Sequence, residues 1–128
     1  MILIKQFIEK LKDKKVYNRL IKGITAKEFD IYADRINRNY WLKDGLIKRK
    51  DKLYYIEPFK KVTKKMLQDL TILETKLLLL IEQHNLLNMT ELEELSEKSY
   101  PTVRKNIVSL IEKGLLKKCG LYYRIKND

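Results

Sequence analysis

Few residues of this chain have the types and spacing that catalysis requires. His84 is the single histidine and Cys119 is the single cysteine. A metal centre needs several ligands together, and a nucleophilic thiol needs a base beside it. Neither residue has such neighbours in the sequence, which also lacks a glycine-rich phosphate loop and an acidic metal-binding cluster. We therefore expect no catalytic residue, no metal and no cofactor, and a protein that is not an enzyme.

The basic residues offer a different chemistry, which is the binding of anions. The chain has 28 Lys and Arg against 17 Asp and Glu, a net charge of +11. Residues 1–65 have a net charge of +11, residues 66–97 of −6 and residues 98–128 of +6. Charge separated in this way favours nucleic-acid binding first and an anionic membrane surface second, with solubility alone as the plain alternative.

The sequence carries no signal for a membrane span or for secretion. Its longest apolar run, Leu77–Ile81, is far shorter than the ~20 residues that cross a bilayer. Residues 1–15 carry a charge every few positions and lack the apolar core of a signal peptide. One cysteine cannot form an internal disulfide, which fits a reducing compartment. We expect a cytoplasmic protein without membrane contacts.

The second half of the sequence predicts three helices followed by a hairpin. The first two helices begin with pairs at capping-box spacing, which are Thr71 with Glu74 and Thr90 with Glu93. A third helix follows Ser99, and Gly114 is suited to end it in a left-handed conformation. The buried stripe of this third helix consists of Val103, Ile107, Leu110 and Ile111. After Gly114, "LLKK", a tight "CG" and "LYYRIK" predict two antiparallel strands.

The segment "SYPTVRKNIVSLIEKGLLKK", residues 99–118, resembles the recognition helix and first wing strand of winged helix-turn-helix proteins, especially MarR-like regulators. The matching residues are Ser99, Thr102, Val103, Arg104, Ile107, Leu110, Gly114, Leu115, Leu116, Lys117 and Lys118. The resemblance covers residues 71–126. It implies a DNA reader that lays its third helix in the major groove and its wing on the flanking backbone. It does not cover a ligand pocket or long dimerisation helices.

A repeated phrase extends the same interpretation to the first half. "GLIKRKDKLYYI" at residues 45–56 parallels "GLLKKCGLYYRI" at residues 114–125, so a diverged second winged helix is predicted there. We expect its helices at residues 2–14 and 15–23, and a third helix from Thr25 to the "KDG" that ends at Gly45. The stripe of this third helix would be Phe29, Ala33, Ile36 and Tyr40. The alternative is a helical extension that borrows a hairpin.

Together these patterns predict a mainly α protein with small β-hairpins, an α+β fold of two tandem winged helix-turn-helix domains. We expect domain 1 at residues 1–59, a basic connector at residues 60–69 and domain 2 at residues 70–128. Each hairpin contains two adjacent tyrosines, Tyr54–Tyr55 and Tyr122–Tyr123. Because side chains alternate along a strand, one ring of each pair should pack on the core while the other faces outward.

The residues expected to contact DNA lie on the third helices and on the wings. Arg and Asn can bind guanine and adenine edges, whereas Lys and hydroxyl groups more often bind phosphate. In the first half the candidates are Arg35, Arg38 and Asn39 on the helix and Lys48, Arg49, Lys50 and Lys52 on the wing. In the second half they are Thr102, Arg104, Lys105, Asn106 and Ser109 on the helix and Lys117, Lys118 and Arg124 on the wing.

The helix expected at residues 71–85 is apolar on a second side. Its core face consists of Leu73, Leu77, Leu80 and Ile81. Ile72 and Leu79 lie one heptad apart and almost opposite that face. A helix that is apolar on two sides is covered on two sides. The second cover would be the other half of the chain, a second copy in a homodimer, or a protein partner.

From these observations we predict a double-stranded DNA-binding protein that regulates transcription. Third helices would read the major groove and basic wings would bind the backbone. An alternative within the same chemistry is a DNA-binding protein for plasmid or viral replication or partition. An alternative of another class is a winged-helix subunit that contacts proteins in a transcription or chromosome complex. The acidic segment 66–97 and the Ile72/Leu79 side keep this last alternative open.

Overall fold

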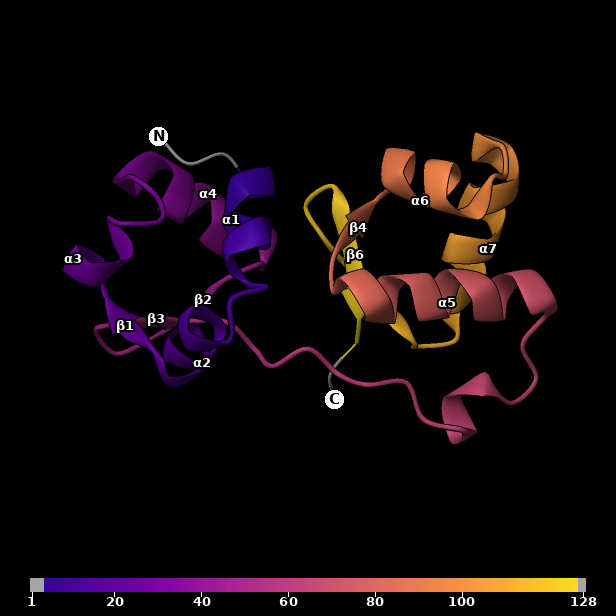
Figure 1. The fold of residues 1–128 in the computed structure, drawn as a ribbon, viewed down its shortest axis with the longest axis horizontal. Helices are drawn as coiled ribbons and strands as arrows, with labels where there is room; N and C mark the ends of the chain where they lie inside the picture. The colour runs from indigo at the N-terminus through magenta and orange to yellow at the C-terminus, as the bar shows by residue number, and fades with distance from the viewer. Residues whose placement is uncertain (1–3, 127–128) are drawn as a thin grey trace. The chain divides into compact units, whose positions relative to one another are not determined.

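The computed structural model describes residues 4–126, and the chain divides into two compact units, Met1–Pro58 and Phe59–Asp128 (Figure 1). The described residues contain seven α-helices and two three-stranded antiparallel sheets, so the architecture is mixed α/β. The combination of helices with small β-hairpins agrees with the sequence prediction. The part of the first predicted helix at residues 2–3 lies outside the described residues. No helix within residues 4–126 has the length and apolar character needed to cross a membrane.

The first unit is built around a cluster of aromatic rings. Its elements are α1 (Ile4–Lys10), α2 (Lys14–Lys22), β1 (Ile24–Thr25), α3 (Ala26–Phe29), α4 (Arg35–Asp44), β2 (Lys48–Lys50) and β3 (Leu53–Tyr55). Phe7, Phe29, Tyr32 and Trp41 are buried, and the ring centroids of Phe7 and Trp41 lie 4.5 Å apart. Large rings bury much apolar surface per residue, which helps so small a unit to form a core.

The second unit has an aliphatic core. Its elements are a 3-10 helix (Lys65–Leu67), α5 (Ile72–His84), β4 (Leu87–Asn88), α6 (Met89–Ser96), α7 (Tyr100–Glu112), β5 (Leu116–Cys119) and β6 (Tyr122–Ile125). The core includes Leu77, Leu78, Ile81, Val103, Ile107 and Leu110, all buried. Residues 60–69, expected as a connector, do not stand apart, because Val62, Met66 and Leu67 pack against this core.

The two units share one order of elements. From α2 onward the first unit runs helix, short strand, helix, helix, hairpin, and the second unit runs the same way from α5. The strand orders also correspond, β1-β3-β2 and β4-β6-β5, so the last strand lies at the centre of each sheet. In register, Lys50 pairs with Leu53 in the first hairpin and Cys119 pairs with Tyr122 in the second. The short strands β1 and β4 were not predicted, because two residues are too few to show the alternation of a strand.

Local capping signals explain where several helices begin and end. Thr25 and Glu28 form a capping box at α3, and the predicted box of Thr71 with Glu74 at α5 is confirmed. Gly45 and Gly114 follow α4 and α7 with φ angles of 82° and 77°, in the left-handed region that glycine adopts without strain. The repeated phrases of the sequence therefore begin at equivalent points, immediately after a helix.

The predicted beginning of α6 is wrong by two residues. The capping box is formed by Asn88 and Glu91 and not by Thr90 and Glu93. Asn88 Oδ1 accepts a hydrogen bond from the Glu91 backbone N–H at 2.8 Å, and Glu91 Oε1 accepts one from the Asn88 N–H at 3.0 Å. Asn88 also ends β4, and its pairing with Tyr122 fixes the point where the strand gives way to the helix.

The structure also corrects the third helix predicted for the first half. α3 ends at Phe29, and α4 begins after Asp34, whose Oδ1 accepts a hydrogen bond of 2.9 Å from the backbone of the first turn. The interruption resets the helical phase, so α4 buries Trp41, while Ile36 and Tyr40 are 77% and 58% exposed. An N-cap aspartate inside an apparently continuous stripe therefore divided one predicted helix into two.

The tyrosine pairs follow the predicted alternation in one hairpin only. Tyr54 is buried and Tyr55 is half-buried, as expected. Tyr122 and Tyr123 are both buried, so the prediction that one of them faces outward is wrong. All four residues of β6 are buried because this strand is the centre of its sheet and both of its faces are covered.

Candidate nucleic-acid interface

The outer side of α7 carries the exposed candidates of the second unit. Val103, Ile107 and Leu110 form the predicted buried stripe, and this phase leaves Thr102, Arg104 and Lys105 exposed. Ile111 was expected in the buried stripe, but it is 37% exposed, and Val108 beside it is 40% exposed. The outer side of α7 is therefore cationic near its beginning and partly apolar near its end.

Arg104 lies within electrostatic reach of the hairpin. Burial raises the pKa of the Tyr123 phenol, the neighbouring Tyr100 raises it further and the Arg104 guanidinium lowers it. Tyr100 is 47% exposed in the first turn of α7, where a flat ring and a hydroxyl face solvent beside Arg104. Tyr100 was not predicted as a site residue. The signal that could have indicated it is its position next to Pro101 at the beginning of the helix.

Two polar candidates on α7 are already engaged within the unit. Ser109 Oγ donates a hydrogen bond to Glu74 Oε2 on α5 at 2.8 Å. The Asn106 side-chain amide donates to the Thr102 backbone carbonyl of the same helix at 2.7 Å. Ser109 was expected on the outward side of α7, but it faces α5 and its hydroxyl is held by Glu74. Asn106 is half-buried and would have to exchange its hydrogen bond to reach a base.

The second hairpin keeps only part of its predicted cationic surface. Lys118 is exposed and Lys117 is half-buried. Arg124 is 3% exposed, and its guanidinium lies 4.6 Å from the centroid of the Phe59 ring. The predicted exposure of Arg124 is wrong because β6 is the central strand and Phe59 covers it. Phe59 was placed at the boundary of the connector, where the sequence gives no sign of a contact with the wing.

In the first unit, α4 exposes Arg35 and Asn39 and buries Arg38. The Arg38 guanidinium donates to the Ala26 carbonyl at 3.1 Å and to Asp30 Oδ1 at 2.9 Å. It also lies over an aromatic ring of β3. The structure thus corrects the placement of Arg38, which joins α4 to α3 and the hairpin in place of facing solvent. The break at Asp34, which resets the helical phase, is the reason for the error.

The first hairpin holds two of its cations in local contacts. Lys48 forms an ion pair with Glu57. Arg49 is exposed, its guanidinium lies 5.6 Å from the centroid of the Tyr54 ring, and its Nε donates to a backbone carbonyl of the turn at 3.1 Å. Arg38 lies over the same ring at 5.2 Å. Arg49 is thus oriented by a cation–π contact, which is worth about 0.5–1 kcal/mol at an exposed site.

The candidates that remain exposed lie on α4, on α7 or on one of the two hairpins. They are Arg35, Asn39, Arg49, Lys50, Lys52, Thr102, Arg104, Lys105 and Lys118. Within residues 4–126, no group of His, Cys, Asp and Glu is arranged to hold a metal ion, and Cys119 is buried. The exposed ammonium and guanidinium groups can bind anions, and the guanidinium and amide groups can donate hydrogen bonds to base edges.

Comparison of the chain with protein-family models, with curated proteins and with solved structures finds no match.

Proposed function

We propose that this chain is a tandem winged helix-turn-helix protein that binds double-stranded DNA as a transcriptional regulator. The observation that carries the proposal is the shared element order and strand order of the two units, each with exposed cations on the hairpin and on the helix before it. A winged helix uses this order to lay that helix in the major groove. The net charge of +11 supports an anionic partner.

The exposed side chains divide into two roles under this proposal. Arginine and asparagine can form two hydrogen bonds to one base edge, so base reading belongs to Arg35, Asn39 and Arg104. Lysine is a compact point charge that suits phosphate, so backbone binding belongs to Lys50, Lys52, Lys105 and Lys118. Each unit contributes to both base reading and backbone binding. A DNA-binding protein for plasmid or viral replication or partition would use the same contacts.

A salt titration of duplex binding tests the proposal. Mobility shifts would compare a random duplex with the corresponding single strand over a series of salt concentrations. If both units touch phosphate, about six contacts give a slope of log affinity against log salt near −5. The duplex should also bind more tightly than the single strand. Absence of duplex binding at low salt, or a slope near −1, would contradict the proposal.

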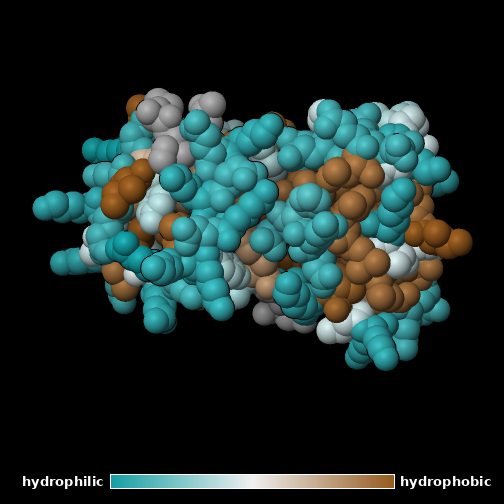
Figure 2. Space-filling view, in the orientation of Figure 1, coloured by the Kyte–Doolittle hydropathy of each residue, from teal (hydrophilic) through white to brown (hydrophobic). Residues whose placement is uncertain are grey.

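A second candidate function is a protein-interaction subunit, and the exposed apolar residues of the second unit favour it. Ile72 and Leu79 on α5 are 91% and 41% exposed, and Figure 2 shows hydrophobic residues gathered over this side of the unit. Val108 and Ile111 add exposed apolar surface to α7. A subunit of this kind would show weak, salt-insensitive duplex binding in the same titration, and this outcome separates the two functions.

A further inference from the structure

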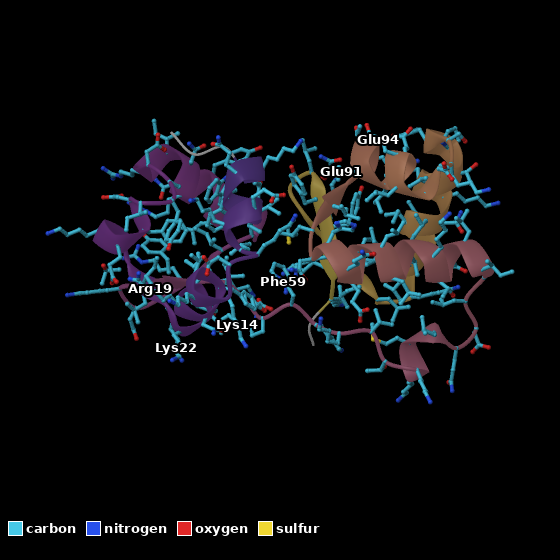
Figure 3. All side chains as sticks on the ribbon, in the orientation of Figure 1. Lys14, Arg19, Lys22, Phe59, Glu91 and Glu94 are labelled. Atoms are coloured by element: carbon cyan, nitrogen blue, oxygen red, sulfur yellow. The ribbon has the colours of Figure 1, made fainter. Side chains whose placement is uncertain are left out.

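A second cationic surface lies on α2 of the first unit, on a helix that the predicted DNA contacts do not include. Its exposed residues are Lys14, Lys15, Asn18, Arg19 and Lys22. At 3.6 residues per turn these five positions fall within an arc of about 140°. The opposite side of the helix packs inward through Leu20, which is fully buried. Figure 3 shows Lys14, Arg19 and Lys22 on this helix, and no acidic residue lies among the five.

Most of the charge on this surface has no partner within the unit. The Arg19 guanidinium pairs with Glu28 Oε2 at 2.8 Å, so its charge is compensated. Lys14, Lys15 and Lys22 form no ion pair with any residue in the described range 4–126. The acid nearest in sequence, Asp13, caps α2 by accepting a hydrogen bond from the Lys15 backbone N–H at 2.9 Å. Three ammonium groups therefore face solvent along one side of a short helix.

The spacing of these groups suits a run of phosphates. Lys14, Asn18 and Lys22 follow one another at intervals of four residues. With a rise of 1.5 Å per residue, Lys14 and Lys22 are about 12 Å apart along the helix axis. One DNA strand places a phosphate about every 3.4 Å along the duplex axis, so two lysines this far apart can contact different phosphates of one strand. Asn18, between the two lysines, supplies a neutral hydrogen-bond donor.

The end of α2 adjoins the first hairpin within the same unit. The Ile56 N–H donates to the Leu20 carbonyl at 3.0 Å, which ties α2 to the end of the sheet. A Cβ atom at Gly23, immediately after α2, would lie 3.3 Å from Cβ of Leu53, and Leu53 pairs with Lys50 of the wing. The cations of α2 and those of the hairpin are therefore held in a fixed relation by one small core.

We propose that Lys14, Lys15, Asn18 and Lys22, which together form the α2 surface, bind the phosphate backbone of the duplex that the first wing contacts. This inference rests on the proposed DNA-binding function. Ammonium groups on a regular helix face carry no base-reading geometry, so the contact is independent of sequence. An anionic membrane is the weaker fit, because the apolar side of α2 is buried and offers nothing to insert.

The test compares two double variants of the full chain, Lys14→Ala/Lys22→Ala and Lys5→Ala/Lys10→Ala. Each variant removes two exposed lysines from one helix of the first unit, so the change in net charge is matched. Alanine is a good helix former, and melting curves would show that both variants are folded. Losing two phosphate contacts should reduce the salt slope of random-duplex binding by about 2 and the affinity at 50 mM salt by about tenfold. The control should retain the wild-type slope.

The outcomes distinguish this inference from the proposed function. If the wild type binds duplex and the two variants have equal slopes and affinities, the α2 surface is not a contact, and the proposed function stands. If the wild type fails to bind duplex at low salt, the proposed function fails as well. Binding of the wild type to phosphatidylserine vesicles, lost in Lys14→Ala/Lys22→Ala while duplex binding is unchanged, would assign the surface to a membrane and overturn the inference.

Discussion

The ammonium group of Lys113 lies 2.8 Å from Oε2 of Glu74, and this ion pair joins the end of α7 to the first turn of α5. Ser109 donates to the same oxygen at 2.8 Å, and the Thr71 N–H donates to Oε1 at 3.0 Å. The hydrogen bond from Lys113 is the main cause that lowers the pKa of Glu74 to about 2, although burial acts in the opposite direction. An ionised, buried carboxylate therefore fixes the proposed recognition helix to its neighbour.

This network predicts that the stability of the second unit depends on acid pH. The pKa of Glu74 is about 2 in the folded chain and 4.5 ordinarily, so its ionised form stabilises the fold above pH 4.5. This contribution should disappear as the pH falls from about 4.5 to about 2. Urea unfolding followed by circular dichroism at several pH values would measure the decline in the free energy of unfolding.

The variant Glu74→Gln isolates this contribution from those of other carboxylates. At pH 7 it should lower the free energy of unfolding by about 1–3 kcal/mol, because hydrogen bonds to a charged group are lost. Near pH 2.5 the difference from the wild type should shrink. The matched control is Glu94→Gln, which changes an exposed glutamate on α6 (Figure 3). Parallel curves for the wild type and Glu74→Gln across this range would contradict the assignment.

A second prediction separates the structural role of Ser109 from the DNA role first expected of it. Because its hydroxyl donates to Glu74, Ser109→Ala should lower the free energy of unfolding by about 1 kcal/mol. Duplex affinity, measured where the variant is fully folded, should remain within about twofold of the wild type. Unchanged stability together with weakened duplex binding would restore Ser109 to the interface.

Where the sequence predicted the fold correctly, the signals were local. The box at Thr71, the Val103/Ile107/Leu110 stripe of α7 and the left-handed Gly114 each depend on a few neighbouring residues, so a single sequence is enough to find them. The first half failed where two local signals competed. Phe29 and Ile36 continue a helical period across Asp34, and only the structure shows that the aspartate begins a new helix.

The candidate interface was harder to predict, because exposure depends on residues that are distant in sequence. Arg38 and Arg124 have ordinary surface patterns, yet Arg38 is buried against the Tyr54 ring and Arg124 against the Phe59 ring. A guanidinium can be covered by an aromatic ring and a carboxylate as readily as it can bind DNA, and the composition of the segment does not distinguish the two. The cations of α2 were not among the predicted contacts, because those candidates were taken only from the third helices and the wings.

A third prediction follows from the burial of Arg38. Arg38→Ala removes the hydrogen bonds to Ala26 and Asp30 and the contact with the Tyr54 ring, so the free energy of unfolding should fall by about 2 kcal/mol. The matched control is Arg35→Ala on the same helix, where the side chain is exposed. This control should leave the melting temperature nearly unchanged and weaken duplex binding. If Arg35→Ala lowered stability and Arg38→Ala weakened duplex binding instead, α4 would have a different helical phase, with Arg35 facing the core.

The last prediction concerns Arg104, the exposed arginine nearest the beginning of α7. Its side chain points away from Val103 and Ile107, so Arg104→Ala should leave the melting temperature nearly unchanged. A bidentate arginine–guanine contact discriminates by about 1–3 kcal/mol, a factor of roughly 5 to 150. Affinity for a site selected from a random-sequence pool should fall by such a factor, while affinity for random duplex should change much less. Paired competition titrations would measure both affinities.

Lys105→Ala provides the comparison, because Lys105 is exposed next to Arg104 on the same helix. As a phosphate contact it should weaken binding to the selected site and to random duplex by similar factors and reduce the salt slope by about 1. Equal losses for Arg104→Ala would make Arg104 a backbone contact, and base reading would then pass to Asn106 once its bond to Thr102 is released. Unfolding of Arg104→Ala would instead show that the electrostatic interaction of Arg104 with Tyr123 supports the fold, because a solvated arginine on an outer helix face contributes little to stability.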